Sequence, residues 1–319
     1  RLAMSGGAIL VAVDGPQAAQ WAGLFRARGE GRPVRLWPEI GDASDVEIAC
    51  VWRAPHGLLA TLPNLRLIVN LAAGVDHLLA DPNLPDVPIV RAAHADLSMR
   101  VTEYVVLHTL RYHRRQPLYE AQQRQRLWKE HPQPAASEVA VGVMGLGVIG
   151  TEAVRVLARI GFRVAGWSTS EKLVDGVETF HGAAGLDPFL ARTEILICLL
   201  PLTKTTRGIL NRSFFARLKR DGAAGGAFLI NAGRGRLQID GDILAALDDG
   251  TLSGATLDVF PHEPLPPESP LWAHPKATIT PHNAGDILPD ILVAEVMAQV
   301  ARLDRGEPLL NVVDRTRGY

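Results

Sequence analysis

Three charged residues in the second half of the chain, Arg234, Glu263 and His282, each follow an apolar run within a few residues. If these runs are parallel strands, the three residues gather around one crevice at the carboxyl ends of the strands, where open α/β sheets bind ligands. Histidine suits proton transfer near neutral pH, a neighbouring carboxylate orients its ring, and a guanidinium binds a carboxylate at two points. The pattern indicates acid–base chemistry on a bound organic acid.

Taken singly, residues of these types usually have a structural explanation. A lone histidine is most often a satisfied surface or core residue, and His262, beside Glu263, is interpreted as a solvated loop residue. The functional interpretation therefore depends on the combination of Arg234, Glu263 and His282 in that order.

A glycine-rich stretch earlier in the chain has the spacing of a dinucleotide-binding turn. Gly145-Leu146-Gly147-Val148-Ile149-Gly150 follows an apolar run at 139–143 and precedes a helical pattern at 151–160. Gly145 permits a tight turn, Gly147 lets the backbone approach a pyrophosphate, and Gly150 lets the helix pack close to the strand. The N–H groups that begin the helix, at Val148 and Ile149, face the phosphates. We expect a dinucleotide here, and the alternative is a turn without a ligand.

The strand after this motif should end near the ribose of the dinucleotide. An NAD site usually has Asp or Glu about 20 residues after the motif to bind the 2′-hydroxyl. Here the sequence is Trp167-Ser168-Thr169-Ser170-Glu171-Lys172, with Ser168 in first position after the strand. The hydroxyls of Ser168, Thr169 and Ser170 and the cation of Lys172 suit a 2′-phosphate, so NADP is expected as the preferred cofactor. Glu171 and the lack of an arginine leave NAD possible.

Composition excludes several classes of protein. Hydrophobic residues make up 47% and charged residues 21% of the 319 residues, as in a globular chain of two domains. The net charge of -1 supplies no basic field for nucleic acid. No apolar run reaches the ~18 residues of a membrane span, and no signal peptide is recognisable, so a cytoplasmic protein is expected. Cys50 and Cys198 lie in apolar runs and are expected to be buried thiols, with no metal site.

Two series of alternating strands and helices are predicted to position these residues. The first has strands at 8–13, 34–37, 48–52, 67–71 and 89–91 and a helix at 18–28. A long helix at 101–112 and a polar, proline-containing stretch at 114–138 follow. The second has strands at 139–144, 163–167, 194–200, 227–231, 255–260 and 278–280 and helices at 151–160, 240–249 and 289–304. Such alternation predicts parallel sheets with helices on their faces.

In this order the motifs resemble those of the D-isomer-specific 2-hydroxyacid dehydrogenase family over essentially the whole chain. They are most similar to its glyoxylate/hydroxypyruvate reductase A branch, as the Trp167-Ser168 turn, the stretch 265–272 and the ending Arg317-Gly318-Tyr319 indicate. The resemblance implies two Rossmann-like or flavodoxin-like parallel-sheet domains with an active-site cleft between them. The substrate domain would be discontinuous, and the layout implied is residues 1–108 plus 289–319 for that domain and 109–288 for the NAD(P)-binding domain. A homodimer is also implied, with a dimerisation arm near residues 114–137.

The resemblance assigns further positions to the substrate. The loop at 70–78 is similar to the family's substrate loop, in which the N–H groups of Ala73, Gly74 and Val75 would bind a carboxylate. An ordinary strand-to-helix turn is the alternative. Trp52 and Arg53 follow the preceding strand, where Trp52 would wall the pocket and Arg53 would bind a substrate oxygen. A packing role is the alternative for both residues.

The resemblance also assigns the remaining cofactor contacts. Leu200, Pro201 and Thr206 would flank the adenosine and pyrophosphate. Asp258 would bind the nicotinamide carboxamide, and Val101 would pack on the nicotinamide unless it is a core residue. The other positions expected to line the cofactor are Asn231, Ala232, Gly233, Arg234, His282, Ala284 and Gly285. Gly285 is followed by Asp286-Ile287, where many members have small residues and then a threonine, so the pocket there is expected to differ in detail.

The chemistry and the resemblance together predict NAD(P)H-dependent reduction of small 2-oxo acids, such as glyoxylate and hydroxypyruvate, to 2-hydroxy acids. The carbonyl carbon takes a hydride and its oxygen takes a proton from His282, while Arg234 binds the carboxylate. The sequence does not rank the 2-oxo acids. One alternative is another dehydrogenase of this fold, acting on formate, phosphite or phosphoglycerate. Another is a nucleotide-sensing protein without catalysis.

Overall fold

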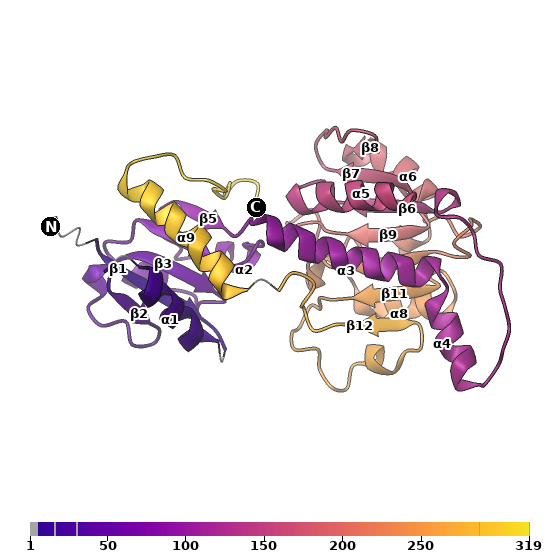
Figure 1. The fold of residues 1–319 in the computed structure, drawn as a ribbon, viewed down its shortest axis with the longest axis horizontal. Coiled ribbons are helices and arrows are strands. Elements are labelled where there is room, and N and C mark those ends of the chain that lie inside the picture. Colours follow the sequence, from indigo (N-terminus) through magenta and orange to yellow (C-terminus); the bar gives the residue numbers. More distant parts are fainter. Residues whose placement is uncertain (1–5, 16, 30, 287, 319) are drawn as a thin grey trace. The chain divides into compact units, whose positions relative to one another are not determined.

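The computed structural model describes residues 6–15, 17–29, 31–286 and 288–318. The chain divides into two compact units, the first made of residues 1–94 and 287–319 and the second of residues 95–286. Each unit is built on one parallel β-sheet with helices packed on it, as the alternation of strands and helices predicts (Figure 1). The end of the chain therefore completes the unit that its beginning starts.

The first unit contains a five-stranded parallel sheet. Its strands are β1 (Ala8–Val13), β2 (Val34–Leu36), β3 (Val46–Trp52), β4 (Leu67–Asn70) and β5 (Ile89–Arg91), in the order β2-β1-β3-β4-β5. Its helices are α1 (Ala18–Arg28), α2 (Asp76–Leu79) and α9 (Pro289–Asp304), with short 3₁₀ helices at Ala43–Asp45 and Leu59–Thr61. Every residue of β1 is buried, because both faces of the sheet are covered, and its sequence is accordingly an unbroken apolar run. Helices α1 and α9 lie side by side on one face, where Phe25, Val293 and Val296 share a core with Ile9 (Figure 1).

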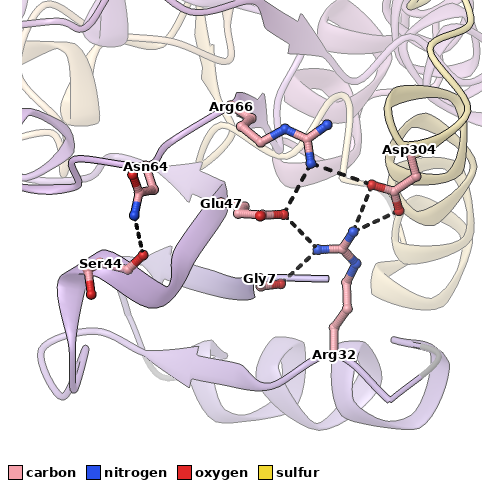
Figure 2. Close-up of polar contacts among 7 residues, drawn as sticks. All are labelled: Gly7, Arg32, Ser44, Glu47, Asn64, Arg66 and Asp304. Atoms are coloured by element: carbon pink, nitrogen blue, oxygen red, sulfur yellow. Dashed lines mark hydrogen bonds and ion pairs between the residues drawn. The ribbon is translucent and has the colours of Figure 1, made fainter. Parts of the chain in front are cut away.

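An ion cluster fastens α9 to the strands that begin the chain (Figure 2). The Arg32 side chain is only 8% exposed. Its Nη2 donates to both carboxylate oxygens of Asp304 at 2.7 Å, and its Nη1 donates to the carbonyl of Gly7 at 2.7 Å and to Glu47 Oε2 at 3.3 Å. Arg66 Nη1 adds a second contact to Glu47 Oε2 at 3.2 Å. Two cations and two anions thus neutralise each other where the last helix meets the first strands.

The second unit contains a seven-stranded parallel sheet. Its strands are β6 (Ala140–Met144), β7 (Arg163–Ser168), β8 (Glu178–His181), β9 (Ile195–Cys198), β10 (Phe228–Asn231), β11 (Gly254–Leu257) and β12 (Ala277–Ile279), in the order β12-β11-β10-β9-β6-β7-β8. The chain builds outward from β6 to β8 and then returns to the other side of β6 with β9. The strand order therefore reverses between β6 and β9. In sheets of this type, ligands bind at the carboxyl ends of the strands that flank such a reversal.

Helices cover both faces of this sheet. They are α3 (Ala95–His113), α4 (Gln116–Arg124), α5 (Val148–Ile160), α6 (Gly182–Arg192), α7 (Arg212–Phe215) and α8 (Asp240–Asp248), with 3₁₀ helices at Ala136–Glu138, Gly235–Leu237 and Pro270–Ala273. Helices α3 and α5 pack against each other (Figure 1), whereas α6, α7 and α8 contribute Phe189, Phe214 and Leu247 to the largest core cluster. Among the described residues, no helix combines the length and the apolar character that crossing a membrane requires.

Two features differ from the sequence-based expectations. The boundary expected at residue 108 lies inside α3, and because α3 packs along α5 the whole helix belongs to the second unit. Strand β8 and helices α6 and α7 are not among the predicted elements. Strand β8 is a partly exposed edge strand, and α7 is only four residues long. Helix α6 begins at Gly182 and contains Pro188, both of which disfavour helix.

Both cysteines are buried free thiols, as predicted. Burial raises the pKa of the Cys198 thiol to about 12 and raises that of Cys50 as well. Neither sulfur is therefore a thiolate near neutral pH.

Asp304→Ala is expected to lower the free energy of unfolding of the first unit by about 2–3 kcal/mol, because it leaves the buried Arg32 guanidinium with one carboxylate fewer. The matched control is Asp290→Ala on the same helix, which removes an exposed pair with Arg28 and should cost less than about 1 kcal/mol. Hydrogen exchange of the β1 amides, followed by mass spectrometry, measures the opening of this unit. Equal effects of the two variants would contradict the importance given to the cluster.

Candidate active site

The glycine turn after β6 has the form that a dinucleotide requires. Gly145 has a φ of +103°, and a Cβ there would lie 2.8 Å from the carbonyl oxygen of Leu199. A Cβ on Gly150 would lie 1.8 Å from the carbonyl oxygen of Gly145. These two glycines are therefore required by the packing of the protein itself.

Gly147 differs, because a Cβ there would meet no protein atom within 4 Å. Gly147 is the N-cap of α5, and no side chain caps that helix end. Val148 in the first turn is 65% exposed, and Ile149 and Gly150 continue the helix. An uncapped helix N-terminus beside space left by a missing side chain fits a pyrophosphate.

The end of β7 presents hydroxyls. Ser168 is 8% exposed, and its Oγ donates to the carbonyl of Ser170 at 2.7 Å, which shapes the turn. Thr169, Ser170 and Lys172 are exposed. No carboxylate stands at the last residue of this strand, where an NAD site would carry one. The turn therefore fits a phosphorylated ribose better than a free 2′-hydroxyl.

The segment after β9 forms a closed turn that faces the same reversal of the sheet. Thr206 is 4% exposed, and its Oγ1 donates to the carbonyl of Pro201 at 2.8 Å and accepts from Thr203 N–H at 2.8 Å. Leu200 is buried at the start of the turn. Thr206 therefore acts in the structure as the brace that shapes the Pro201 turn.

Asn231, at the end of β10, fixes the loop that carries Arg234. Its Nδ2 donates to Gln238 Oε1 at 2.7 Å and to the carbonyl of Arg234 at 3.3 Å, and its Oδ1 accepts from Gly233 N–H at 3.1 Å. Asn231 is fully buried, Ala232 is half-buried and Gly233 is buried. The Arg234 side chain is partly exposed, and its Nη1 donates to the carbonyl of Gly233 at 2.8 Å.

Glu263 and His282 are brought together by the loops after β11 and β12. His282 Nδ1 lies 2.7 Å from Glu263 Oε2, and Glu263 Oε1 accepts from Phe260 N–H at 3.0 Å. The His282 side chain is 41% exposed and that of Glu263 is 18% exposed. The Glu263 carboxylate, held at one oxygen by a backbone amide, thus fixes Nδ1 of the His282 ring with the other. His262 is exposed, as predicted.

Gly235 allows the Arg234 and Glu263 loops to approach each other. A Cβ on Gly235 would lie 1.9 Å from the carbonyl carbon of Phe260, so only glycine fits there. The sequence interpretation did not single out Gly235, although a glycine directly after a candidate arginine is a signal for close backbone approach.

Asp258 holds the loop that carries His282. Its carboxylate is 1% exposed and accepts from Thr280 Oγ1 at 2.6 Å, Asn283 N–H at 3.0 Å and Ala284 N–H at 3.1 Å. Its main-chain carbonyl accepts from His282 N–H at 2.9 Å. His282 has a φ of +53°, a conformation that histidine adopts more readily than most residues. These four hydrogen bonds maintain that conformation.

Val101, on α3, is 5% exposed and packs beside Gly285. A Cβ on Gly285 would lie 2.8 Å from Leu97 Cδ1 and 3.1 Å from Val101 Cγ2. The glycine therefore lets the end of the His282 loop lie against α3. Of the Asp286-Ile287 departure, Ile287 lies outside the described residues, as does Tyr319 of the C-terminal motif.

The first unit brings together the positions predicted for the substrate. Trp52 and Arg53 are exposed at the end of β3, with the Arg53 guanidinium 5.3 Å from the Trp52 ring centroid. Arg53 N–H donates to Nε2 of His77, the second residue of α2, at 3.3 Å.

The loop that ends at α2 is shaped by a buried asparagine. Nδ2 of Asn70 donates to the carbonyls of Ala72 and Gly74 at 2.6 and 2.9 Å. Ala73 and Gly74 are half-buried and Val75 is buried. The Trp52-Arg53 strand end and the loop that holds Ala73, Gly74 and Val75 are thus linked within one unit.

The second unit is a dinucleotide-binding α/β domain that carries a histidine–carboxylate pair at the carboxyl edge of its sheet. Residues 106–284 match the family described as "D-isomer specific 2-hydroxyacid dehydrogenase, NAD binding domain". The chain is 38% identical to a glyoxylate/hydroxypyruvate reductase A from Yersinia enterocolitica, over 95% of this chain and 97% of that protein. The chain belongs to the D-isomer specific 2-hydroxyacid dehydrogenase family.

Two solved structures are similar over nearly the full length. One is an NADPH-dependent glyoxylate/hydroxypyruvate reductase from Sinorhizobium meliloti in complex with NADP and sulfate, with a TM-score of 0.93, 42% identity, and coverage of 98% of this chain and 100% of that chain. The other is a probable 2-hydroxyacid dehydrogenase from Rhizobium etli in complex with NADP, HEPES and L(+)-tartaric acid, with a TM-score of 0.92, 42% identity, and coverage of 99% and 100%.

Gly147→Ala is expected to leave the melting temperature unchanged, because its Cβ meets open space, while weakening NADPH binding roughly 10- to 100-fold. The contrasting variant is Gly150→Ala, which should fail to fold because its Cβ would collide with the Gly145 carbonyl. Thermal melting and fluorescence titration with NADPH provide the two measurements. Unchanged NADPH affinity in Gly147→Ala would show that no phosphate lies against this turn.

Proposed function

We propose that this chain is an NADPH-preferring reductase of small 2-oxo acids, with glyoxylate and hydroxypyruvate as substrates. The observation that carries the proposal is the contact of 2.7 Å between His282 Nδ1 and Glu263 Oε2, on the same sheet edge as the Gly147 turn. Curated relatives named glyoxylate/hydroxypyruvate reductase A support this substrate class, and the two NADP complexes support the cofactor.

The cofactor preference rests on the residues around the end of β7. Ser168, Thr169, Ser170 and Lys172 offer donors and a cation to a 2′-phosphate, and Glu171 is the acidic residue that leaves NAD usable. The N-terminus of α5 and the turns at Leu200–Pro201 and Asn231–Gly233 hold the rest of the dinucleotide. When bound, the reduced nicotinamide supplies the hydride that the carbonyl carbon accepts.

His282 is the proton donor in this proposal. Glu263 Oε2 accepts a hydrogen bond from Nδ1 of the protonated ring, so Nε2 carries the proton that passes to the carbonyl oxygen of the substrate. The adjacent carboxylate stabilises the charged imidazolium before the transfer. Because Phe260 N–H holds Oε1, the carboxylate keeps its orientation throughout. Arg234 binds the substrate carboxylate and polarises the carbonyl.

The first unit supplies substrate recognition in this proposal, and the second supplies the cofactor site. The N–H groups around Ala73, Gly74 and Val75 bind the substrate carboxylate, Arg53 binds a substrate oxygen, and Trp52 limits the size of the substrate side chain. Asp258, Val101, Ala284 and Gly285 lie beside the nicotinamide. A cytoplasmic location is part of the same proposal.

Purified protein should oxidise NADPH in the presence of glyoxylate or hydroxypyruvate, with a higher kcat/KM for NADPH than for NADH. Steady-state kinetics with both cofactors and a series of 2-oxo acids measures this. Oxidation of formate or phosphite, which needs no proton donor, would instead identify another dehydrogenase. Tight NADPH binding without turnover of any acid would identify a nucleotide-sensing protein.

His282→Ala is expected to lower kcat by about 10²- to 10⁴-fold, because the carbonyl oxygen loses its proton donor. The matched control is His262→Ala, which removes an exposed imidazole from the Glu263 loop and should leave kcat unchanged. Nearly unchanged turnover in His282→Ala would contradict the role of His282 as proton donor.

We further propose a homodimer formed through the arm at residues 114–137. After α4 the arm has no helix or strand up to residue 135, and hydrogen bonds such as that from Arg115 Nε to the carbonyl of Pro132 at 3.0 Å hold it. Trp128 on this arm is 95% exposed, and Leu127 and Leu118, also on the arm, are 49% and 39% exposed. An isolated subunit would leave this apolar surface in water.

Trp128→Ser is therefore expected to raise the dimer dissociation constant roughly 30-fold or more, as for a central aromatic contact. Trp272→Ser serves as the control, since Trp272 is 54% exposed but lies outside the arm. Light scattering over a range of concentrations gives the molar mass. A monomeric wild-type protein, or a Trp128→Ser dimer as stable as wild type, would exclude the arm as the interface.

A further inference from the structure

Two tyrosines on α3 reach the sheet of the second unit through the same kind of contact. Tyr104 Oη lies 2.7 Å from Thr280 Oγ1, at the end of β12, and Tyr112 Oη lies 2.8 Å from Thr256 Oγ1, within β11. The two tyrosines are eight residues apart, on the same side of the helix. Only the first contact leads to the loop that carries His282.

The Asp258 carboxylate decides which group donates in each hydrogen bond of Thr280. The Asp258 carboxylate accepts hydrogen bonds, so Thr280 Oγ1 donates its single hydrogen to Asp258 Oδ1, at 2.6 Å. The hydrogen between Tyr104 and Thr280 must then come from Tyr104. Burial raises the pKa of the Tyr104 hydroxyl, which keeps it a donor throughout the neutral range.

Asp258 Oδ1, which accepts the hydrogen of Thr280, also connects this series of hydrogen bonds to the His282 loop. Asp258 Oδ1 also accepts from Asn283 N–H at 3.0 Å, and Oδ2 accepts from Ala284 N–H at 3.1 Å. The N–H of His282 itself donates to the main-chain carbonyls of Asp258 and Thr280 at 2.9 and 3.1 Å. The orientation of the Asp258 carboxylate therefore sets the positions of the two backbone amides that follow His282, while the main-chain carbonyl of Asp258 holds the amide of His282 itself.

We propose that Tyr104 is a positioning residue that acts on His282 through Thr280 and Asp258. The proposal rests on the proposed function, in which His282 donates the proton. By donating to Thr280, the Tyr104 hydroxyl fixes the Thr280 rotamer and directs the threonine hydrogen at Asp258 Oδ1. Without it, Thr280 can turn its hydroxyl elsewhere, Asp258 can rotate, and the His282 loop loses its fixed conformation.

The ring that packs against Tyr104 on α3 belongs to His108, one turn further along the helix. The ring of His108 lies 4.5 Å from that of Tyr104, centroid to centroid, and is 6% exposed. Burial, with the nearby Arg111 cation, lowers the pKa of His108 to about 4, so its imidazole is neutral where the enzyme would act. His108 therefore packs against Tyr104 without attracting the Asp258 carboxylate.

Tyr104→Phe is expected to lower kcat for glyoxylate about tenfold while leaving the KM for NADPH unchanged, because a misplaced donor slows the chemical step and not cofactor binding. Tyr112→Phe removes the same hydroxyl from the same helix and from a more buried site, and should leave kcat unchanged. Equal losses of kcat in the two variants would reduce Tyr104 to an ordinary packing residue and overturn the proposal.

A double-mutant cycle tests the route of the effect. Thr280→Val should lower kcat on the order of 10²-fold, and Thr280→Ser, which keeps the hydroxyl, should restore most of it. If Tyr104 acts through Thr280, then Tyr104→Phe changes kcat by less than about twofold in the Thr280→Val background. A full tenfold loss in that background would show that Tyr104 acts by another route.

A second measurement requires no turnover. The chain has 10 histidines, and the His282 ring signal in NMR spectra of histidine-labelled protein can be assigned by its absence in His282→Ala. We expect Tyr104→Phe and Thr280→Val to shift this signal and Tyr112→Phe to leave it in place. If wild-type protein reduces no 2-oxo acid, the proposed function fails, and an unshifted His282 signal in Tyr104→Phe independently overturns the positioning role.

Discussion

All strands of a parallel sheet end at the same edge, and the candidate active site depends on this constraint. The loops that carry the site residues lie close together because β6, β7, β9, β10, β11 and β12 run in the same direction and stay in register. Each of these loops carries one feature of the candidate site: a glycine turn after β6, hydroxyls after β7, a guanidinium after β10 and the histidine–carboxylate pair after β11 and β12. A strand that ran the other way would carry its residue to the opposite edge, more than one strand length away.

The loops at this edge are fixed mainly by backbone hydrogen bonds to a few buried polar side chains. Asn231 braces the Arg234 loop, Thr206 braces the Pro201 turn, and Asp258 braces the His282 loop. Asn231 ends β10, Asp258 directly follows β11 and Thr206 lies in the loop after β9, and all three are nearly inaccessible to water. Buried polar groups that are satisfied in this way favour a single loop conformation, which proton transfer over a few ångströms requires. The candidate site residues Arg234 and His282 can therefore remain partly exposed on loops whose backbone is fixed.

Much of this arrangement could be predicted from the sequence because the strands are buried on both faces. Runs such as Ala8–Val13 and Ala140–Met144 are continuous and apolar, so their positions and the edge at which their loops lie follow directly. The edge strand β8 and the glycine- and proline-containing α6 were missed, since their stability comes from packing and not from local preference. The bracing role of Asp258, whose carboxylate accepts from Thr280 and two backbone amides, had no sequence signal, because these partners lie 22 to 26 positions away. Tyr104 had no sequence signal, because its relation to Thr280 spans 176 positions and depends on how α3 packs.

The return of the last helix to the first sheet has a consequence for synthesis of the chain on the ribosome. When residues 1–94 have emerged, one face of their sheet still lacks α9, which supplies Val293, Val296 and Val300 to the core and Asp304 to Arg32. The second unit, by contrast, is continuous from residue 95 to 286 and is complete before α9 is made. Residues 1–94, less than a third of the 319-residue chain, must therefore wait with apolar surface uncovered while the second unit folds ahead of them. The first unit is thus begun first and completed last. This order makes it the part of the nascent chain that most needs protection from aggregation.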